Sequence, residues 1–386
     1  MKAMILAAGK GTRIRPLTNI MPKPMIPLLS KPVMESIIEH LYRYNFREII
    51  VNTSYLSNSI ESYFRDGSPW GVEIAYSYEG YLENDQFIDK PLGSAGGMKK
   101  IQQFSGFFDD TFIVVCGDAL IDVNFHEVIA FHKSRKSIAT LVMKEVSPSE
   151  VNKYGIVVTD AQGQVVQFQE KPSMEEALST SANTGIYVFE PEIFNYIPDN
   201  VEFDIGSQLF PALVSHQVPF YGIALPFQWV DIGSVPDFWI ANRLLLTKEV
   251  GGHKIPGKEV KPGIWCGINV KIDFDKVNIH GPVYIGSSTE IQDDVTIIGP
   301  TFIGANCLIE SGANITEGLI TDYTRIGHQA TIEQHIVFAG KVISPNGTTI
   351  DLHEAGLDWL IDDRRRQTLQ NEENALLNEL IYHANQ

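Results

Sequence analysis

The sequence predicts an α/β domain followed by a parallel β-helix. Through roughly the first 245 residues, short apolar runs alternate with segments of helical spacing, which is typical of an α/β domain with a largely parallel sheet. After residue 262 the hydrophobic period becomes six residues, which matches neither a helix nor a simple alternating strand. The length of 386 residues also favours two domains over one.

The first region repeats the order strand, helix, strand. Continuous apolar runs predict buried strands, and apolar residues at helical spacing predict the helices between them. In such sheets, ligands bind beyond the carboxyl ends of the strands. The predicted elements are a strand at 3–6, a helix at 32–44, a strand at 49–51, a helix at 56–64, a strand at 72–78 and a strand at 112–116.

Isoleucines mark the six-residue period of the second region. Such a period fits a three-sided parallel β-helix, in which each hexapeptide forms one side and the isoleucines stack inside. The series is Ile279, Ile285, Ile291, Ile297, Ile303, Ile309 and Ile315, and then, after a slip of one residue, Ile320, Ile326 and Ile332.

Composition narrows the choice of partner and compartment. The formal net charge of −17 argues against nucleic acid or an anionic membrane as the main partner. No run of 18 apolar residues occurs, so no transmembrane helix is expected. Cys116, Cys266 and Cys307 are widely spaced, which predicts a reducing, cytoplasmic location and argues against a thiol-ligated zinc site.

The segment 6–24 carries the strongest chemical signal. Small residues follow the first strand, and small residues let backbone N–H groups approach a phosphate closely. Lys10, Arg13, Arg15 and Lys23 supply the positive charge that a triphosphate needs. The segment is not a Walker motif, and Gly-Lys-Gly alone would also fit an ordinary tight turn.

This segment resembles the signature of the sugar nucleotidyltransferases: Gly-x-Gly-Thr-Arg, then Pro-Leu-Thr, then Pro-Lys-Pro. Further motifs follow in the order found in that family, so the resemblance covers nearly the whole chain. These motifs are Pro91–Gly96, Gly117-Asp118, Tyr154-Gly155, Glu170-Lys171-Pro172, Asn183–Tyr187 and Trp229–Gly233.

The resemblance implies a Rossmann-like mixed sheet in the catalytic domain and a left-handed β-helix after it. A stretch rich in Gly, Pro and Lys looks like the linker between them. Leucines and isoleucines between residues 357 and 383 predict a helix that caps the β-helix or pairs subunits. The expected boundaries are 1–248 for the catalytic domain, 249–262 for the linker, 263–345 for the β-helix and 346–386 for a helical tail.

By this resemblance, the enzyme joins a nucleoside triphosphate to a sugar 1-phosphate and releases pyrophosphate. Asp118 and Asp231 match the aspartates that hold Mg²⁺ in the family, and carboxylate oxygens suit that ion. The alternative for Asp118 is a helix cap, and for Asp231 a turn. Arg13 and Lys23 match the cations that bind the triphosphate, and Lys171 matches the one that binds the sugar phosphate.

The remaining predicted contacts divide between the two substrates. For several of them the sequence alone would suggest no more than a turn or an exposed ion pair. The nucleotide contacts are Leu6, Ala7, Ala8, Gly9, Gly11, Thr12, Glu79, Gly93 and Ser94, and the sugar-phosphate contacts are Gly117, Gly155, Glu170, Lys171 and Asn183.

The base and the sugar stay open at this stage. Ala8 favours UTP, because guanylyl and thymidylyl enzymes of the family more often have glycine there. Glu79 favours GTP, because a carboxylate can accept from both N–H donors of the guanine edge, whereas uracil offers one. We expect UTP with glucose 1-phosphate, and GTP with mannose 1-phosphate is the alternative, ahead of dTTP or ATP.

Other features depart from the family or admit other classes. Residues 80–90 look like an insertion, and Ser207 stands where many relatives have a basic residue. Hexapeptide β-helices also occur in acyltransferases, with His280, His328 and His335 as candidate bases, although rim positions explain them better. A non-catalytic regulatory subunit is the rival of another class, and the retained site residues argue against it. The β-helix favours a homo-oligomer.

Overall fold

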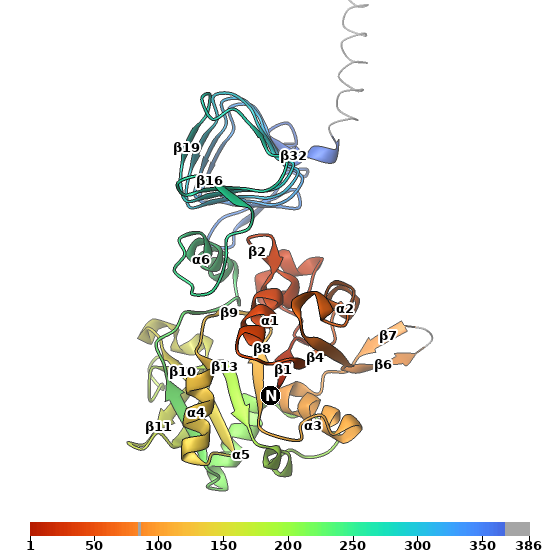
Figure 1. Ribbon diagram of the computed structural model, residues 1–386, viewed down its shortest axis with the longest axis vertical. Coiled ribbons are helices and arrows are strands. Elements are labelled where there is room, and N and C mark those ends of the chain that lie inside the picture. The colour runs from red at the N-terminus through yellow and green to blue at the C-terminus, as the bar shows by residue number, and fades with distance from the viewer. Residues whose placement is uncertain (84–85, 367–386) are drawn as a thin grey trace, which may run out of the picture. The chain divides into compact units, whose positions relative to one another are not determined.

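The computed structural model describes residues 1–83 and 86–366 (Figure 1). These residues form two compact units. The first unit comprises Met1–Ile26 and Lys31–Gly233, and the second comprises Pro27–Ser30 and the chain from Ser234 onwards. Each unit is described by itself below.

A nine-stranded mixed sheet forms the centre of the first unit. Its strands are β12 (Val165–Glu170), β11 (Gly155–Thr159), β13 (Ser181–Phe189), β8 (Phe112–Cys116), β1 (Lys2–Leu6), β4 (Glu48–Thr53) and β5 (Glu73–Tyr78) in spatial order, with β10 (Ala139–Glu145) paired to β13 and β14 (Phe220–Ala224) paired to β10. β8, β1, β4 and β5 run parallel, whereas β13 runs antiparallel to β8.

Helices cover both faces of this sheet (Figure 1). They are α1 (Val33–Arg43), α2 (Ser57–Phe64), α3 (Gly93–Ser105), α4 (Phe125–Arg135) and α5 (Phe210–Ser215). Successive strand residues point to opposite faces: Ile113 and Val115 pack in the core with α1, α2 and α4, whereas Phe112 and Val114 pack with α3 and α5. The α/β prediction is confirmed, and each strand and helix predicted before residue 117 is present.

The predicted insertion at 80–90 contains a hairpin. Strand β6 (Gly80–Glu83) pairs antiparallel with β7 (Gln86–Asp89), and the pair follows directly after β5. In Figure 1 this hairpin projects from the edge of the first unit beyond β4.

The second unit contains a parallel β-helix with three sheets. One sheet contains β17 (Ile264–Cys266), β20 (Val283–Ile285), β23 (Thr301–Ile303), β26 (Leu319–Ile320) and β29 (Ile336–Phe338); another contains β18 (Lys271–Ile272), β21 (Glu290–Ile291), β24 (Leu308–Ile309) and β27 (Thr324–Ile326); the third contains β19 (Asn278–His280), β22 (Thr296–Ile298), β25 (Asn314–Thr316) and β28 (Thr331–Glu333). This arrangement is consistent with the expected left-handed β-helix. Helix α6 (Val235–Leu246) and strand β16 (Lys258–Lys261) precede it.

The predicted isoleucine series forms the interior of the β-helix. Ile285 pairs with Ile303, so one coil takes 18 residues, and both side chains are fully buried. The next coil is one residue shorter, because Ile303 pairs with Ile320. The short corner contains Gly318, where a Cβ would lie 2.8 Å from a methyl group of Ile315. The slip in the sequence is therefore a tighter corner and not an interruption of the stack.

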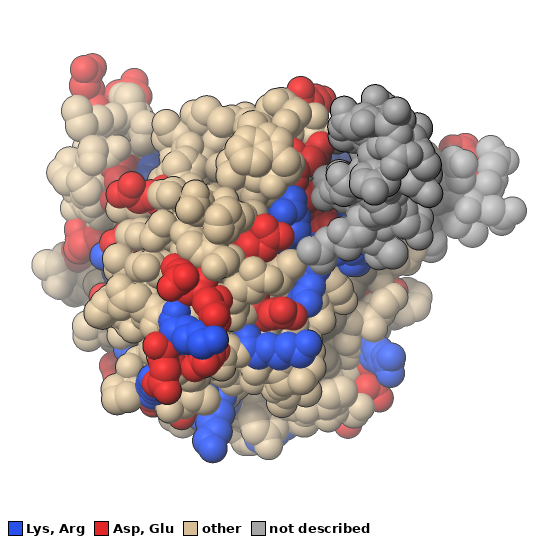
Figure 2. All heavy atoms as spheres, turned by 90° about the horizontal axis from the view of Figure 1, so that it is seen from above, with Lys and Arg blue, Asp and Glu red and all other residues tan. Residues whose placement is uncertain are grey.

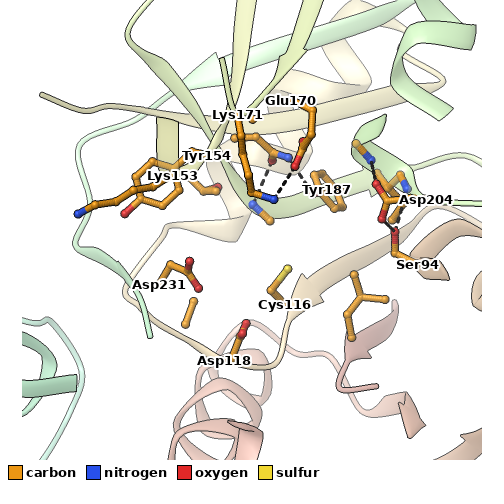
Figure 3. A pocket seen from close by; sticks show the side chains of 18 of the residues that line it. Ser94, Cys116, Asp118, Lys153, Tyr154, Glu170, Lys171, Tyr187, Asp204 and Asp231 are labelled. Atoms are coloured by element: carbon orange, nitrogen blue, oxygen red, sulfur yellow. Dashed lines mark hydrogen bonds and ion pairs between the residues drawn. The ribbon is translucent and has the colours of Figure 1, made fainter. Parts of the chain in front are cut away.

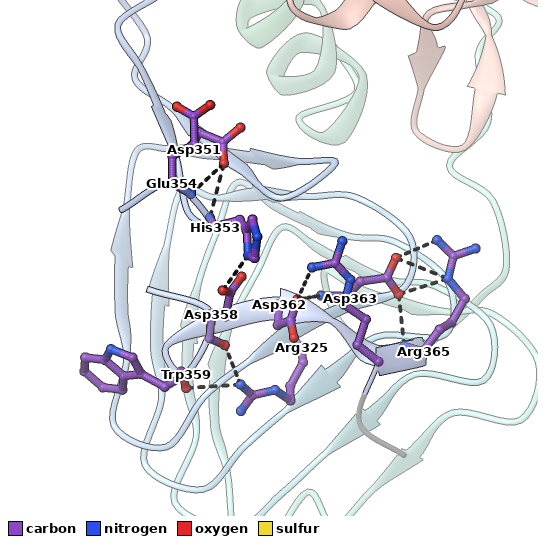
Figure 4. A network of polar contacts seen from close by, with 10 residues as sticks. Arg325, Asp351, His353, Glu354, Asp358, Trp359, Asp362, Asp363 and Arg365 are labelled. Carbon is purple, nitrogen blue, oxygen red and sulfur yellow. Dashed lines mark hydrogen bonds and ion pairs between the residues drawn. The ribbon is translucent and has the colours of Figure 1, made fainter. Parts of the chain in front are cut away.

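The C-terminal end of the β-helix is covered by strands. They are β30 (Lys341–Ile343), β31 (Thr349–Asp351) and β32 (Ile361–Asp363). β32 runs antiparallel to β27 (Figure 4). Arg325 of β27 is only 8% exposed and donates to Glu310 Oε1 at 3.1 Å and to the carbonyl oxygen of Asp358 at 2.8 Å. This buried guanidinium fastens the returning segment to the last coils.

The prediction of a helix beginning at residue 357 is wrong for the described part of the tail. Residues 361–363 form β32, and Arg364–Arg366 form a short 3₁₀ turn. Pairing with β27 satisfies the backbone of β32, and Ile361 is buried against the β-helix interior. The remainder of the predicted tail, 367–386, lies outside the described residues.

A buried histidine connects α4 to the sheet. His132 is fully buried, with Nδ1 2.8 Å from Thr140 Oγ1 and Nε2 3.1 Å from Glu190 Oε1. The neutral ring satisfies both contacts when Nε2 donates to the carboxylate and Thr140 donates to Nδ1. Burial lowers the pKa of His132, and Glu190 opposes this only in part.

The surface carries charges of both signs. On the face seen in Figure 2, basic and acidic side chains lie beside one another among the atoms that are not grey. In the described part of the chain, no helix is long and apolar enough to span a bilayer.

Truncating an interior isoleucine should destabilise the β-helix strongly. Ile303→Ala leaves a cavity at a fully buried site and is expected to lower the free energy of unfolding by roughly 2–5 kcal/mol. Ile298→Ala, at a position that is 39% exposed in the same coil, should cost about 1 kcal/mol or less. Urea unfolding of both variants measures the difference, and equal losses would contradict the assigned interior.

Acidification should destabilise the first unit partly through His132. The unfolded ring binds a proton near its ordinary pKa of 6.5, whereas the folded ring resists protonation. The contribution is therefore complete above that pH and is lost as pH falls towards the lower folded pKa. When the pH is lowered from 7.5 to 5, we expect the free energy of unfolding to fall less for His132→Gln than for the unsubstituted protein. Parallel pH profiles for the two proteins would rule this out.

Candidate active site

A pocket in the first unit opens at the carboxyl ends of β1 and β8 (Figure 3). The register places Leu6, the last residue of β1, beside Cys116, the last residue of β8. All five residues predicted to be catalytic line this pocket, as do five of the other predicted contacts. They are Arg13, Lys23, Asp118, Lys171 and Asp231, with Leu6, Ser94, Gly155, Glu170 and Asn183.

The glycine-rich loop holds Lys23 at the pocket. Gly11 has a φ of 62°, and a Cβ at this position would lie 2.5 Å from Lys23 Cγ. The Thr18 hydroxyl donates to the Gly11 carbonyl at 2.7 Å. Glycine at position 11 therefore lets the loop pass over the aliphatic part of Lys23. Arg13 reaches the same pocket from the following turn, η1 (Thr12–Ile14).

Two short strands bring the predicted metal ligands together. β9 (Ala119–Ile121) runs antiparallel to β15 (Trp229–Asp231), with Asp231 opposite Ala119. Asp118 immediately precedes β9. Figure 3 shows both carboxylates on one side of the pocket, directed into it. Residues that are far apart in the sequence thus share one small sheet.

Lys23 forms an ion pair with Asp118, one of these two carboxylates. Its Nζ lies 2.8 Å from Asp118 Oδ2, and its side chain is 11% exposed. Burial lowers the pKa of Lys23, but Asp118 and Asp231 outweigh burial, so this pKa lies above its ordinary value. Lys23 is therefore positively charged at neutral pH and available to an anionic ligand.

The carboxylate pair fits magnesium better than zinc. Among residues 1–83 and 86–366, no group of three or more His, Cys, Asp or Glu side chains could hold a metal. Mg²⁺ is usually bound through one or two carboxylates, with water and substrate phosphates completing the shell. Asp118 and Asp231 match that donor set, whereas a structural zinc site needs four protein ligands.

The opposite side of the pocket carries Glu170 and Lys171 (Figure 3). β12 ends at Glu170, which pairs with Gly155 at the start of β11. Lys171 has a φ of 47°, which is a strained value for a lysine, and its N–H donates to the Tyr154 carbonyl at 3.1 Å. Its Nζ lies 2.7 Å from Glu170 Oε1. The backbone therefore places Lys171 at the pocket, on the side opposite Asp118.

Other predicted contacts do not line the pocket formed by the described residues. Most of them adjoin residues that do: several follow Leu6, one precedes Asp118 and one precedes Ser94. Glu79 differs, because it lies at the end of β5 with an exposed fraction of 2%, and both of its carboxylate oxygens already accept hydrogen bonds from the chain. The predicted contacts that do not line the pocket are Ala7, Ala8, Gly9, Gly11, Thr12, Glu79, Gly93 and Gly117.

Sequence reasoning gave no role to several residues that line the pocket. Asp204 is the most informative, because its Oδ2 accepts from the Ser94 hydroxyl at 2.8 Å and its Oδ1 accepts from the Gly206 N–H at 2.9 Å. Aspartate before a helical run is a capping signal that could have identified it. The lining residues without a predicted contact role are Cys116, Ala119, Lys153, Tyr154, Thr184, Gly185, Tyr187, Asp204, Ile205, Gly206 and Trp229.

The lining suits a reaction between anions. Its cations are Arg13, Lys23, Lys153 and Lys171, and its carboxylates are Asp118, Glu170, Asp204 and Asp231. Burial raises the pKa of the Cys116 thiol well above its ordinary value, so the thiol stays protonated and is a poor nucleophile. The pocket therefore offers charge and positioning in place of covalent catalysis.

The chain is similar in sequence to known nucleotidyltransferases. The sequence model of the nucleotidyl transferase family matches residues 2–248. A UTP--glucose-1-phosphate uridylyltransferase of Synechocystis sp. is 52% identical over 370 residues, which cover 96% of this chain and 95% of that protein. The mannose-1-phosphate guanylyltransferase catalytic subunit beta of Xenopus tropicalis is 32% identical over 243 residues, 62% of either chain.

Solved structures support the fold. A UDP-glucose pyrophosphorylase complexed with UDP-glucose superposes with a TM-score of 0.53 at 22% identity, over 64% of this chain and 98% of that one. The resemblance to the sugar nucleotidyltransferases is confirmed by the family match and by the near full-length relative. This chain belongs to the nucleotidyl transferase family and is a sugar-1-phosphate nucleotidyltransferase.

Proposed function

We propose that this enzyme converts UTP and glucose 1-phosphate to UDP-glucose and pyrophosphate. One observation carries the proposal: Asp118 and Asp231 face Lys171 across a single pocket, which Lys23, paired with Asp118, also lines. The choice of base and sugar rests on the near full-length similarity to a protein named UTP--glucose-1-phosphate uridylyltransferase and on Ala8 in the first loop.

The reaction exchanges one phosphorus–oxygen bond for another. An oxygen of the sugar phosphate attacks the α-phosphorus of UTP as the bond to the bridging oxygen breaks, and pyrophosphate leaves. Two anions must meet, so neutralisation and alignment supply most of the rate. In this proposal Lys171 binds the sugar phosphate, Lys23 lies at the α-phosphate and Arg13 neutralises the departing pyrophosphate.

Asp118 and Asp231 hold a divalent cation, Mg²⁺, in this proposal. When bound, the ion adds positive charge at the phosphate oxygens and orients them. Glu170 and Asn183 bind hydroxyl groups of the sugar. The short sheet of β9 and β15 gives the two aspartates a rigid base, which limits reorganisation during the reaction.

Two alternatives have definite tests. Mannose-1-phosphate guanylyltransferase relatives at 32% identity favour GTP with mannose 1-phosphate as the second candidate reaction. A regulatory role without catalysis is disfavoured, because the five residues predicted to be catalytic converge in one pocket. The expected homo-oligomer and cytoplasmic location stay predictions.

Pyrophosphate release should identify the substrates. The purified full-length chain would be supplied with Mg²⁺ and each of UTP, GTP, dTTP, ATP and CTP, paired with glucose 1-phosphate or mannose 1-phosphate. We expect the highest kcat/KM for UTP with glucose 1-phosphate. A preference for GTP with mannose 1-phosphate would replace the assignment, and no turnover with any pair would favour the regulatory role.

Asp118→Asn should lower kcat by roughly 10²–10³-fold, because one of the two charges that hold the cation is removed. The matched control is Asp109→Asn, whose carboxylate pairs with Lys2 outside the pocket and should leave kcat unchanged. Steady-state assays over a series of Mg²⁺ concentrations measure both variants. Full activity of Asp118→Asn at ordinary Mg²⁺ would remove the metal assignment.

A further inference from the structure

Two buried polar side chains connect the segments that are expected to hold the nucleotide. Asn52 is the second-to-last residue of β4, and Glu79 directly follows the last residue of β5. Each has an exposed fraction of 2%. Neither lines the pocket formed by the described residues. Their hydrogen bonds, and not direct access to the pocket, therefore indicate what they do.

The hydrogen bonds link four chain segments and converge on the Glu79 carboxylate. The Ala7 N–H donates to Asn52 Oδ1 at 2.9 Å, and Asn52 Nδ2 donates to Glu79 Oε1 at 2.7 Å. The Leu92 N–H donates to Glu79 Oε2 at 3.0 Å. Ala7 belongs to the loop after β1, and Leu92 lies directly before Gly93 at the start of α3. The pair thus joins both nucleotide-facing segments.

The neighbouring helix α3 leaves room for Glu79 because it has a glycine, Gly97, at the point of contact. A Cβ at Gly97 of α3 would lie 2.4 Å from Glu79 Oε1. Burial raises the pKa of Glu79, and the donors from Leu92 and Asn52 oppose this only in part. A buried carboxylate is costly unless donors surround it, so Glu79 depends on the hydrogen bonds from Asn52 and Leu92, and these bonds tie it to both segments.

We propose that Asn52 and Glu79 are positioning residues that set the separation between the loop 6–12 and the start of α3 at residues 92–94. The proposal rests on the proposed function, because these segments are the expected nucleotide contacts. Glu79 is only 2% exposed and does not line the pocket formed by the described residues, so its carboxylate does not present two acceptors to a guanine edge there. This removes the argument from Glu79 for GTP and leaves Ala8 in favour of UTP.

Because the donor and the acceptor of each hydrogen bond are known, the proposal can be tested by exchanging the amide of residue 52 with the carboxylate of residue 79. In Glu79→Gln, the new NH₂ group faces another donor, either Asn52 Nδ2 or the Leu92 N–H, so one hydrogen bond is lost. Rotating the Asn52 amide by 180° would not restore it, because the Asn52 NH₂ group would then face the Ala7 N–H. Asn52→Asp places two carboxylates side by side. The double variant Asn52→Asp/Glu79→Gln satisfies all three bonds again with the same total charge: the new carboxylate at position 52 accepts from Ala7 and from the new amide at position 79, whose oxygen accepts from Leu92.

Steady-state kinetics of the unsubstituted enzyme and these three variants test the proposal. Each single variant should raise KM for UTP roughly tenfold or more, as expected for an unsatisfied buried polar group, with a smaller change in kcat and in KM for glucose 1-phosphate. The double variant should return KM for UTP to within about threefold of the original value. Calorimetric titration with UTP and thermal unfolding would separate weak binding from poor folding in any variant with little turnover.

Two results would overturn the proposal. One is a double variant whose KM for UTP equals or exceeds the combined effect of the singles. The other is a Glu79→Gln variant that shifts the ratio of UTP to GTP use while Asn52→Asp leaves that ratio unchanged, which would make Glu79 a direct reader of the base. If a variant does not fold, Gly97→Ala gives a second test, because its methyl group displaces Glu79 and should also raise KM for UTP. Failure of the unsubstituted enzyme with every substrate pair would instead reject the proposed function.

Discussion

The parallel pairing of β1 with β4 and β8 is the constraint on which the site depends. It places Leu6, Asn52 and Cys116 in one row at the edge of the sheet. The glycine-rich loop leaves this row after Leu6, and Asp118 follows two residues after Cys116. Because both faces of these strands are packed in the core, a register shift of one residue would move each side chain to the opposite face of the sheet and disrupt the packing on both sides. Hydrophobic burial therefore fixes positions at which charged groups meet.

The charged groups at this edge are held by backbone as much as by one another. Gly11 shapes the loop that passes over Lys23, and the strained backbone at Lys171 places that residue on the far side of the pocket. A site for two anionic substrates gains from such preorganisation, because little rearrangement accompanies the reaction. The carboxylates Asp118 and Asp231 keep the local charge near balance, which reduces the cost of burying Lys23.

Most of the fold could be predicted because its periods are strong. Apolar runs at 3–6 and 112–116 and the isoleucine series leave few alternatives, and the structure confirms them. Residues that act through tertiary contacts were less accessible. Asp204 carries a local capping signal, but its contact with Ser94, like that of Asn52 with Glu79, forms only when distant segments pack. The tail was misjudged at 361–363 because the spacing of its apolar residues suits a helix, yet β27 offers an unpaired strand edge.

The antiparallel return of β32 onto β27 also determines how this architecture can change in length. Each coil of the β-helix pairs with its neighbours in parallel, so a whole coil of 18 residues, such as that from Ile285 to Ile303, presents the same edge below and above. Duplication or deletion of such a unit preserves every backbone pairing. β32 runs in the opposite direction, and Arg325 of β27 binds the segment that leads into it, so β32 does not present the parallel edge that a further coil would need on that sheet. In evolution or engineering, coils can therefore be added or removed inside the β-helix, while the antiparallel pairing of β32 with β27 stays unchanged.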